Sequence, residues 1–138
     1  MIAAAVKKPL ITLVVGLACS FFWVLTADAA EGFATYYTTE SCKREGTSGV
    51  WTASGERYDE KALTCALALR SFGGSYVVYG ERTGRSVIVR HNDFGPGRGP
   101  RARGVIIDLT PAAFVEVCGD LKIGRCQVSV QEVKTLKS

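Results

Sequence analysis

Six short apolar runs, most of them rich in β-branched or aromatic residues, recur along this chain and are separated by glycine-containing turns. Runs of this length and composition are typical of β-strands. We therefore expect strands at residues 32–39, 62–69, 75–79, 86–90, 105–109 and 126–133. Six short strands joined by many turns predict a mainly β protein that forms a small closed barrel.

One segment has the signature of a helix. Thr110 is a suitable N-cap, Pro111 suits the first helical position, and Gly119 suits the C-terminal end, so a short helix is expected over residues 112–118. Residues 40–54 and 94–104 are rich in glycine and charge and are expected to be loops. The second loop is cationic, and it either contacts substrate or is held in solvent by its charge.

The N-terminus resembles a targeting segment. Lys7 and Lys8 precede an apolar stretch that runs to Leu25, and Ala27 and Ala29 form a small-x-small cleavage site. This pattern predicts a secretory signal peptide over residues 1–29 and a single domain over residues 30–138. The alternatives are a retained membrane anchor, although the stretch is short for a span of about 20 residues, and lipidation at Cys19. The expected location is the periplasm or cell envelope.

The cysteine content agrees with export. Of five cysteines, Cys42, Cys65, Cys118 and Cys126 remain after removal of residues 1–29. An even number in a small exported domain predicts two disulfides. Glycines between the last two allow the chain to turn back, so Cys118–Cys126 is the preferred pair and Cys42–Cys65 is the other. With one histidine and no Cys-x-x-Cys, we expect no metal site and no cofactor.

Charge restricts the class of partner. The formal net charge of +4 falls to +3 when Lys7, Lys8 and Asp28 are removed with the signal peptide. A mild positive charge is consistent with an anionic polymer as partner. The chain lacks the interleaved basic and aromatic residues typical of single-stranded nucleic-acid binding. We expect a monomer that binds no nucleic acid.

Polar side chains gather at the end of one predicted strand. Residues 87–89 are β-branched, and Arg90, His91, Asn92 and Asp93 follow them before Gly95-Pro96 turns the chain. His91 and Asp93 are two residues apart and share a face if the strand stays regular. Polar groups mounted on a buried strand favour a functional site, whereas Asp93 alone also suits a turn cap.

Several stretches together resemble a known family. They read Thr-Ala-Ser-Gly-Glu-Arg-Tyr-Asp at 52–59, Ala-Leu-Thr-Cys-Ala at 62–66, Gly-Arg-Ser-Val-Ile-Val-Arg at 84–90, Asn-Asp-x-Gly-Pro at 92–96 and Ile-Ile-Asp-Leu-Thr at 106–110. In this order they resemble the rare lipoprotein A family over about residues 33–133. The resemblance implies a six-stranded double-psi β-barrel, as in expansins, and lytic transglycosylase activity on peptidoglycan glycan strands.

The resemblance also implies site residues. The catalytic candidates are Asp93, Glu56 and Asp108, which match the family's Asn-Asp-Arg-Gly-Pro, Ser-Gly-Glu and Ile-Asp-Leu motifs. The expected substrate contacts are His91, Asn92, Tyr58, Trp51 and Arg90. Two positions depart from the pattern. Leu67 stands where the family has the histidine of Leu-Thr-Ala-Ala-His, and Phe94 stands where it has the arginine after the motif aspartate.

A lytic transglycosylase cleaves the bond between N-acetylmuramic acid and N-acetylglucosamine without adding water. One carboxyl serves as acid and then as base, so its pKa must be raised. Asp93 is our first choice for that carboxyl, and Asp108 and Glu56 are its partners. Each partner has a simpler interpretation: Asp108 contacts the helix at Pro111, or Glu56 pairs with Arg57 or Arg90.

Two other functions remain open from the sequence. One is a non-catalytic, expansin-like module that binds cell-wall glycans through its aromatic side chains. The other is a secreted structural barrel with an idle cleft. The substitution at Leu67 favours these two, while retention of the three carboxylates favours an enzyme.

Overall fold

The computed structural model describes residues 23–25, 28–47 and 49–135. Most of the predicted signal peptide, including Cys19, lies outside these residues. The elements in chain order are β1 (Trp23–Leu25), β2 (Ala30–Tyr36), α1 (Thr39–Arg44), β3 (Thr64–Leu67), β4 (Ser75–Gly80), β5 (Ser86–Phe94), α2 (Arg98–Ala102), β6 (Val105–Leu109), α3 (Pro111–Cys118), the 3-10 turn η1 (Leu121–Ile123) and β7 (Cys126–Thr135).

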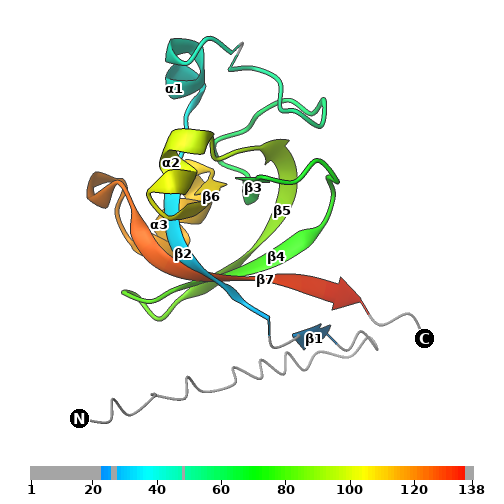
Figure 1. Ribbon diagram of the computed structural model, residues 1–138, viewed down its shortest axis with the longest axis vertical. Helices are drawn as coiled ribbons and strands as arrows, with labels where there is room; N and C mark the ends of the chain where they lie inside the picture. The colour runs from blue at the N-terminus through cyan, green and yellow to red at the C-terminus, as the bar shows by residue number, and fades with distance from the viewer. Residues whose placement is uncertain (1–22, 26–27, 48, 136–138) are drawn as a thin grey trace.

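Six strands close into a barrel, as predicted (Figure 1). Their order is β7-β2-β6-β3-β5-β4, and pairing of β4 with β7 completes the circle. The pairs β2–β6 and β3–β5 are parallel and the other pairs are antiparallel. β1 adds an antiparallel extension to β7 outside this circle. Closure leaves the six barrel strands without an open edge.

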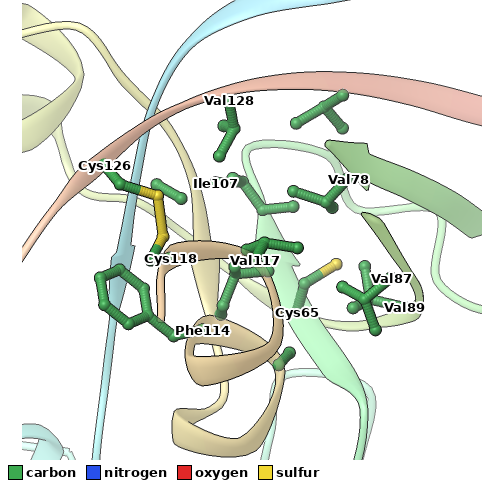
Figure 2. Close-up of a cluster of buried hydrophobic side chains, with 14 of the residues drawn as sticks. Cys65, Val78, Val87, Val89, Ile107, Phe114, Val117, Cys118, Cys126 and Val128 are labelled. Atoms are coloured by element: carbon green, nitrogen blue, oxygen red, sulfur yellow. A yellow bond between two sulfur atoms is a disulfide. The ribbon is translucent and has the colours of Figure 1, made fainter. Parts of the chain in front are cut away.

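The interior of the barrel is apolar (Figure 2). Val78, Val89, Ile107 and Val128 are fully buried, each from a different strand. Because alternate residues of a strand face opposite sides, these strands bury one face and expose the other, as the burial pattern of β5 shows.

The helix α3 forms where the sequence predicts it. Thr110 is its N-cap, with the Thr110 hydroxyl accepting a hydrogen bond from the Ala113 N–H, Pro111 opens it, and Gly119 ends it with φ of 92°. Phe114 and Val117 are fully buried and pack the helix into the barrel core (Figure 2).

Both segments predicted to be loops contain short helices. α1 begins at Thr39, the last residue of the predicted strand 32–39, and extends into the predicted loop because Thr38 and Ser41 satisfy each other's backbone N–H groups in a capping box. Within residues 94–104, α2 forms through backbone hydrogen bonds such as Arg101 N–H to the Gly97 carbonyl (3.1 Å). The prediction of a single helix was therefore wrong, because α1 and α2 form in addition to α3.

One of the two predicted disulfides is confirmed. Cys118 at the end of α3 is bonded to Cys126 at the start of β7, with 5.8 Å between their Cα atoms. The predicted Cys42–Cys65 bond is wrong, since both are free thiols. Cys65 faces the core between Val117 and Val87 (Figure 2), while Cys42 lies on α1 and lines a surface cleft.

Within the described ranges, no helix combines the length and the apolar character needed to cross a membrane.

Candidate active site

A cleft of about 390 Å³ opens between the barrel and the segment that contains α1. Its lining comes from four regions that are far apart in the sequence: the end of β2 with α1 and the following loop, β3 with the residue stretch after it, the end of β5, and β6. The lining residues are Tyr37, Cys42, Glu45, Thr47, Gly49, Trp51, Thr52, Ala53, Tyr58, Ala66, Arg70, Asp93, Phe94, Gly95, Gly97 and Asp108.

Asp108 projects from β6 into this cleft. Its Oδ1 accepts a hydrogen bond from the Thr35 hydroxyl, and Thr35 is its direct partner in the parallel β2–β6 pair. A Cβ at position 95 would lie only 3.2 Å from Asp108 Oδ2, so Gly95 leaves room for the carboxyl group. Burial, and to a smaller extent the charges of Glu45 and Asp93, raise the pKa of Asp108 against the opposing hydrogen bond from Thr35.

Asp93 lines the same cleft as an anchored carboxylate. Its Oδ1 accepts hydrogen bonds from the backbone N–H groups of Ala53 (2.9 Å) and Phe94 (2.8 Å). The hydrogen bond from the Phe94 N–H matches the simpler interpretation, in which Asp93 caps the turn. The hydrogen bond from the Ala53 N–H connects residues 52–58 to β5. The simpler interpretation of Asp108 is not what the structure shows, because the carboxyl bonds Thr35.

A bulge in β5 separates His91 from Asp93. His91 pairs with Cys65 and Asp93 pairs with Ala66, which leaves Asn92 as the extra residue. His91 is therefore fully buried against Phe72, with ring centroids 5.1 Å apart, and its Nε2 contacts the Asp93 carbonyl oxygen (2.8 Å). The expectation that His91 and Asp93 share a face is wrong, and an enclosed ring does not touch substrate.

Glu56, Arg90 and Asn92 form a polar network beside the cleft. Glu56 receives two hydrogen bonds from the Arg90 guanidinium, one of them 2.7 Å long, and one from Asn92 Nδ2 (3.0 Å). These bonds lower the pKa of Glu56 to about 2. None of the three lines the cleft. The network joins the 52–58 turn to β5, while the catalytic role of Glu56 and the substrate contacts of Arg90 and Asn92 stay predictions.

Aromatic side chains form part of the cleft wall. Trp51 is 61% exposed, the highest value among the large hydrophobic side chains that the structure describes. The Tyr58 ring stacks on the Tyr37 ring with 4.7 Å between centroids, and the Tyr58 hydroxyl donates to the Tyr37 carbonyl (2.6 Å). Trp51 and Tyr58 both line the cleft, and their contact with substrate stays a prediction.

Two residues of the site escaped sequence analysis. Thr35 carries no motif, and only the pairing of β2 with β6 brings its hydroxyl to Asp108. Arg70 follows β3, and its guanidinium carbon lies 4.1 Å from the centroid of the Phe94 ring. The only sequence signal near Arg70 is Phe94, which stands where the motif has an arginine.

The fold and the cleft define the class of protein: a six-stranded double-psi β-barrel with a cleft lined by the carboxyl groups of Glu45, Asp93 and Asp108. The family described as lytic transglycolase matches residues 29–130, and the chain belongs to this family.

Curated relatives support this assignment. A probable endolytic peptidoglycan transglycosylase RlpA from Nostoc sp. is 38% identical over 101 residues, which are 73% of this chain and 25% of the relative. The endolytic peptidoglycan transglycosylase RlpA of Neisseria meningitidis serogroup A is 37% identical over 82 residues, which are 59% of this chain and 32% of the relative. The chain therefore spans only about a quarter to a third of the length of these relatives.

Solved structures share the fold. Streptomyces papain inhibitor superposes with a TM-score of 0.58 at 22% identity and covers 78% of this chain and 96% of its own. A mutant Clavibacter michiganensis expansin in complex with cellohexaose gives a TM-score of 0.56 at 20% identity, covering 78% of this chain and 51% of its own.

Proposed function

We propose that this protein is an exported lytic transglycosylase that cleaves the bond between N-acetylmuramic acid and N-acetylglucosamine in peptidoglycan. The observation that carries the proposal is the half-buried carboxyl of Asp108, which lines the cleft, is held by the Thr35 hydroxyl and has a raised pKa. The family match and the names of the relatives supply the reaction class and the substrate. The disulfide and the pattern of the N-terminal segment support export.

Asp108 suits proton transfer better than Asp93, our first choice from the sequence. A raised pKa keeps more of the carboxyl protonated near neutral pH, as a general acid requires. Asp93 instead accepts two backbone hydrogen bonds at one oxygen, which fix its position, and its charge contributes to the raised pKa of Asp108.

The reaction balances with Asp108 as both acid and base. Protonated Asp108 donates its proton to the glycosidic oxygen as the bond between that oxygen and the anomeric carbon breaks. The muramyl 6-hydroxyl then attacks the anomeric carbon and returns a proton to Asp108. The products are a free 4-hydroxyl on one strand and a 1,6-anhydro ring on the other, and no water is consumed.

Asp93 serves as the anion of the site. Its negative charge contributes to the raised pKa of Asp108 and faces the positive charge that develops at the anomeric carbon. The network of Glu56 with Arg90 and Asn92 holds the turn that supplies the Ala53 N–H to Asp93.

Release of anhydro-muropeptides, measured by mass spectrometry, tests these roles. Asp108→Asn should lower the rate by about 10²–10⁴-fold. Asp93→Asn should lower it less and move the alkaline limb of the pH–rate profile to lower pH, because the charge that raises the pKa of Asp108 is gone. Full activity of Asp108→Asn, with folding intact, would exclude this assignment.

A second candidate is a non-catalytic module that binds cell-wall glycans. The exposed Trp51 in the cleft and the shared fold with an expansin that holds cellohexaose favour it. Binding to peptidoglycan by the wild-type protein without product release would support this second function over the first.

A further inference from the structure

Arg70 is the one cationic side chain among the described residues that line the cleft, where Glu45, Asp93 and Asp108 are the acidic ones. Its guanidinium lies over the Phe94 ring, with 4.1 Å from the guanidinium carbon to the ring centroid. Within the described part of the chain, no ion pair or hydrogen bond of this guanidinium is found. A cation that is held in place with its N–H donors unused is a ready binding group.

We propose that Arg70 binds a carboxylate of the substrate and thereby selects carboxylate-bearing glycan strands over neutral ones. This inference rests on the proposed function and deepens it. A neutral glycan needs no cation in the cleft, whereas an anionic glycan would be repelled by Asp93 and Glu45 unless a positive charge compensated. Arginine presents a planar set of donors that fits a carboxylate in a bidentate manner.

The stacking on Phe94 supports this role. The aromatic ring holds one face of the guanidinium and leaves the N–H groups at its edge free, which reduces the entropy lost when a carboxylate binds. Phe94 is itself 39% exposed and lines the cleft, so the pair is accessible.

The residue after Asp93 departs from the motif that this chain resembles. The motif that this chain resembles has an arginine at the position of Phe94, directly after the aspartate. Here Arg70, from the segment after β3, places a guanidinium over the ring of Phe94, the residue at that motif position. Leu67 and Phe94 are paired across the β3–β5 ladder, so the segment that follows Leu67 starts beside Phe94.

Two parts of peptidoglycan offer the carboxylate. One is the lactyl group of a muramic acid that carries no peptide, and the other is a carboxylate of the stem peptide. The test therefore uses glycan strands with free lactyl carboxylates, strands with stem peptides, peptide-free strands whose carboxylates are converted to amides, and chitohexaose as a neutral glycan.

The experiment is calorimetric titration of each glycan into the Asp108→Asn protein, which prevents turnover, with and without Arg70→Met. Methionine keeps an apolar chain over Phe94 and removes the charge. We expect Arg70→Met to weaken binding of one carboxylate-bearing ligand by about tenfold or more and to leave the amidated strands and chitohexaose unchanged. The ligand that loses affinity identifies the source of the carboxylate.

Two controls separate a binding role from a structural one. Arg82→Met removes an exposed arginine of the turn between β4 and β5, outside the cleft lining, and should leave every affinity unchanged. Phe94→Arg added to Arg70→Met should recover affinity for the carboxylate-bearing ligand, because a guanidinium returns to the same part of the cleft.

The outcomes separate this inference from the proposed function. Equal weakening for charged and neutral glycans, or no weakening at all, overturns the role of Arg70 while leaving the proposed function standing. Failure of the Arg70-containing protein to bind any glycan overturns both.

Discussion

At the scale of single residues, the fold opposes the ionisation of Asp108, the proposed proton donor. Its folded pKa lies above the ordinary value of 3.8. The folded protein therefore binds this proton more tightly than the unfolded chain does. The contribution to stability is full below about pH 3.8 and is lost as the pH rises through the folded pKa.

This leads to a prediction for Asp108→Asn. The variant lacks the ionisation, so its free energy of unfolding should exceed that of the wild type at neutral pH, by about 1.4 kcal/mol for each unit by which the pKa is raised. The difference should shrink as the pH falls toward 3.8. Urea unfolding from pH 4 to pH 8 measures it, with Asp59→Asn as an exposed control. A variant less stable than the wild type at neutral pH would contradict the prediction.

The two free thiols also differ at this scale. Cys65 is fully enclosed, and burial raises its pKa to about 12, while Cys42 is half-buried in the cleft. Alkylation of the native protein should modify Cys42 and leave Cys65 unmodified until the protein unfolds, because thiolate and access are both required. Peptide mapping without reduction decides this, and a cross-linked peptide containing Cys42 and Cys65 would refute it.

At the scale of elements, the alternation of side chains along β3 determines whether a residue faces the core or the cleft. Leu67 is buried in the core cluster, whereas its neighbour Ala66 lines the cleft. Leu67→His would therefore place an imidazole in the core. It should lower the free energy of unfolding by about 2–5 kcal/mol and should not increase activity.

Leu69→His is the matched control for that substitution. Leu69 is 49% exposed, so a histidine there should change stability little. Thermal unfolding and anhydro-muropeptide release of both variants provide the measurement. A stable Leu67→His protein with raised activity would show that position 67 serves the cleft after all.

Some elements were predictable because their signals are local. Thr110 and Pro111 mark the start of the eight-residue helix α3, and Gly119 marks its end. The β-branched run of β5 marks a buried strand. The bulge at Asn92 was not predictable, since it exists only relative to β3. Likewise, the Thr35–Asp108 contact and the separation of Cys42 from Cys65 depend on how distant strands align.

At the scale of the whole molecule, the cleft draws on both the barrel and the segments that connect its strands. α2 carries Arg98 and Arg101, Arg103 follows it, and all three are exposed. Gly97, which precedes α2, lines the cleft, so these arginines lie beside its rim. The two interpretations of the cationic segment 94–104, substrate contact and plain solvation, can be separated by the effect of salt.

Replacement of Arg98, Arg101 and Arg103 by serine should weaken binding to peptidoglycan sacculi at low salt and leave the melting temperature nearly unchanged. Binding of the wild type should weaken with salt, because exposed charges are screened over about 10 Å at 0.1 M. A sedimentation assay at two salt concentrations measures both effects. The control replaces three exposed basic residues of other elements, Arg82, Lys122 and Lys134. Unaltered binding by the α2 variant at low salt would show that the segment is only solvated.

The central claim is that the carboxyl groups of the cleft cleave the glycan without water. Digestion of peptidoglycan by the wild-type protein in water labelled with heavy oxygen tests it most directly, with mass spectrometry of the products. The account predicts muropeptides one water lighter than hydrolysis products, carrying a 1,6-anhydro ring and no heavy oxygen at the cleaved bond. Reducing-end products that contain the heavy oxygen, or no cleavage by a correctly folded protein, would contradict it.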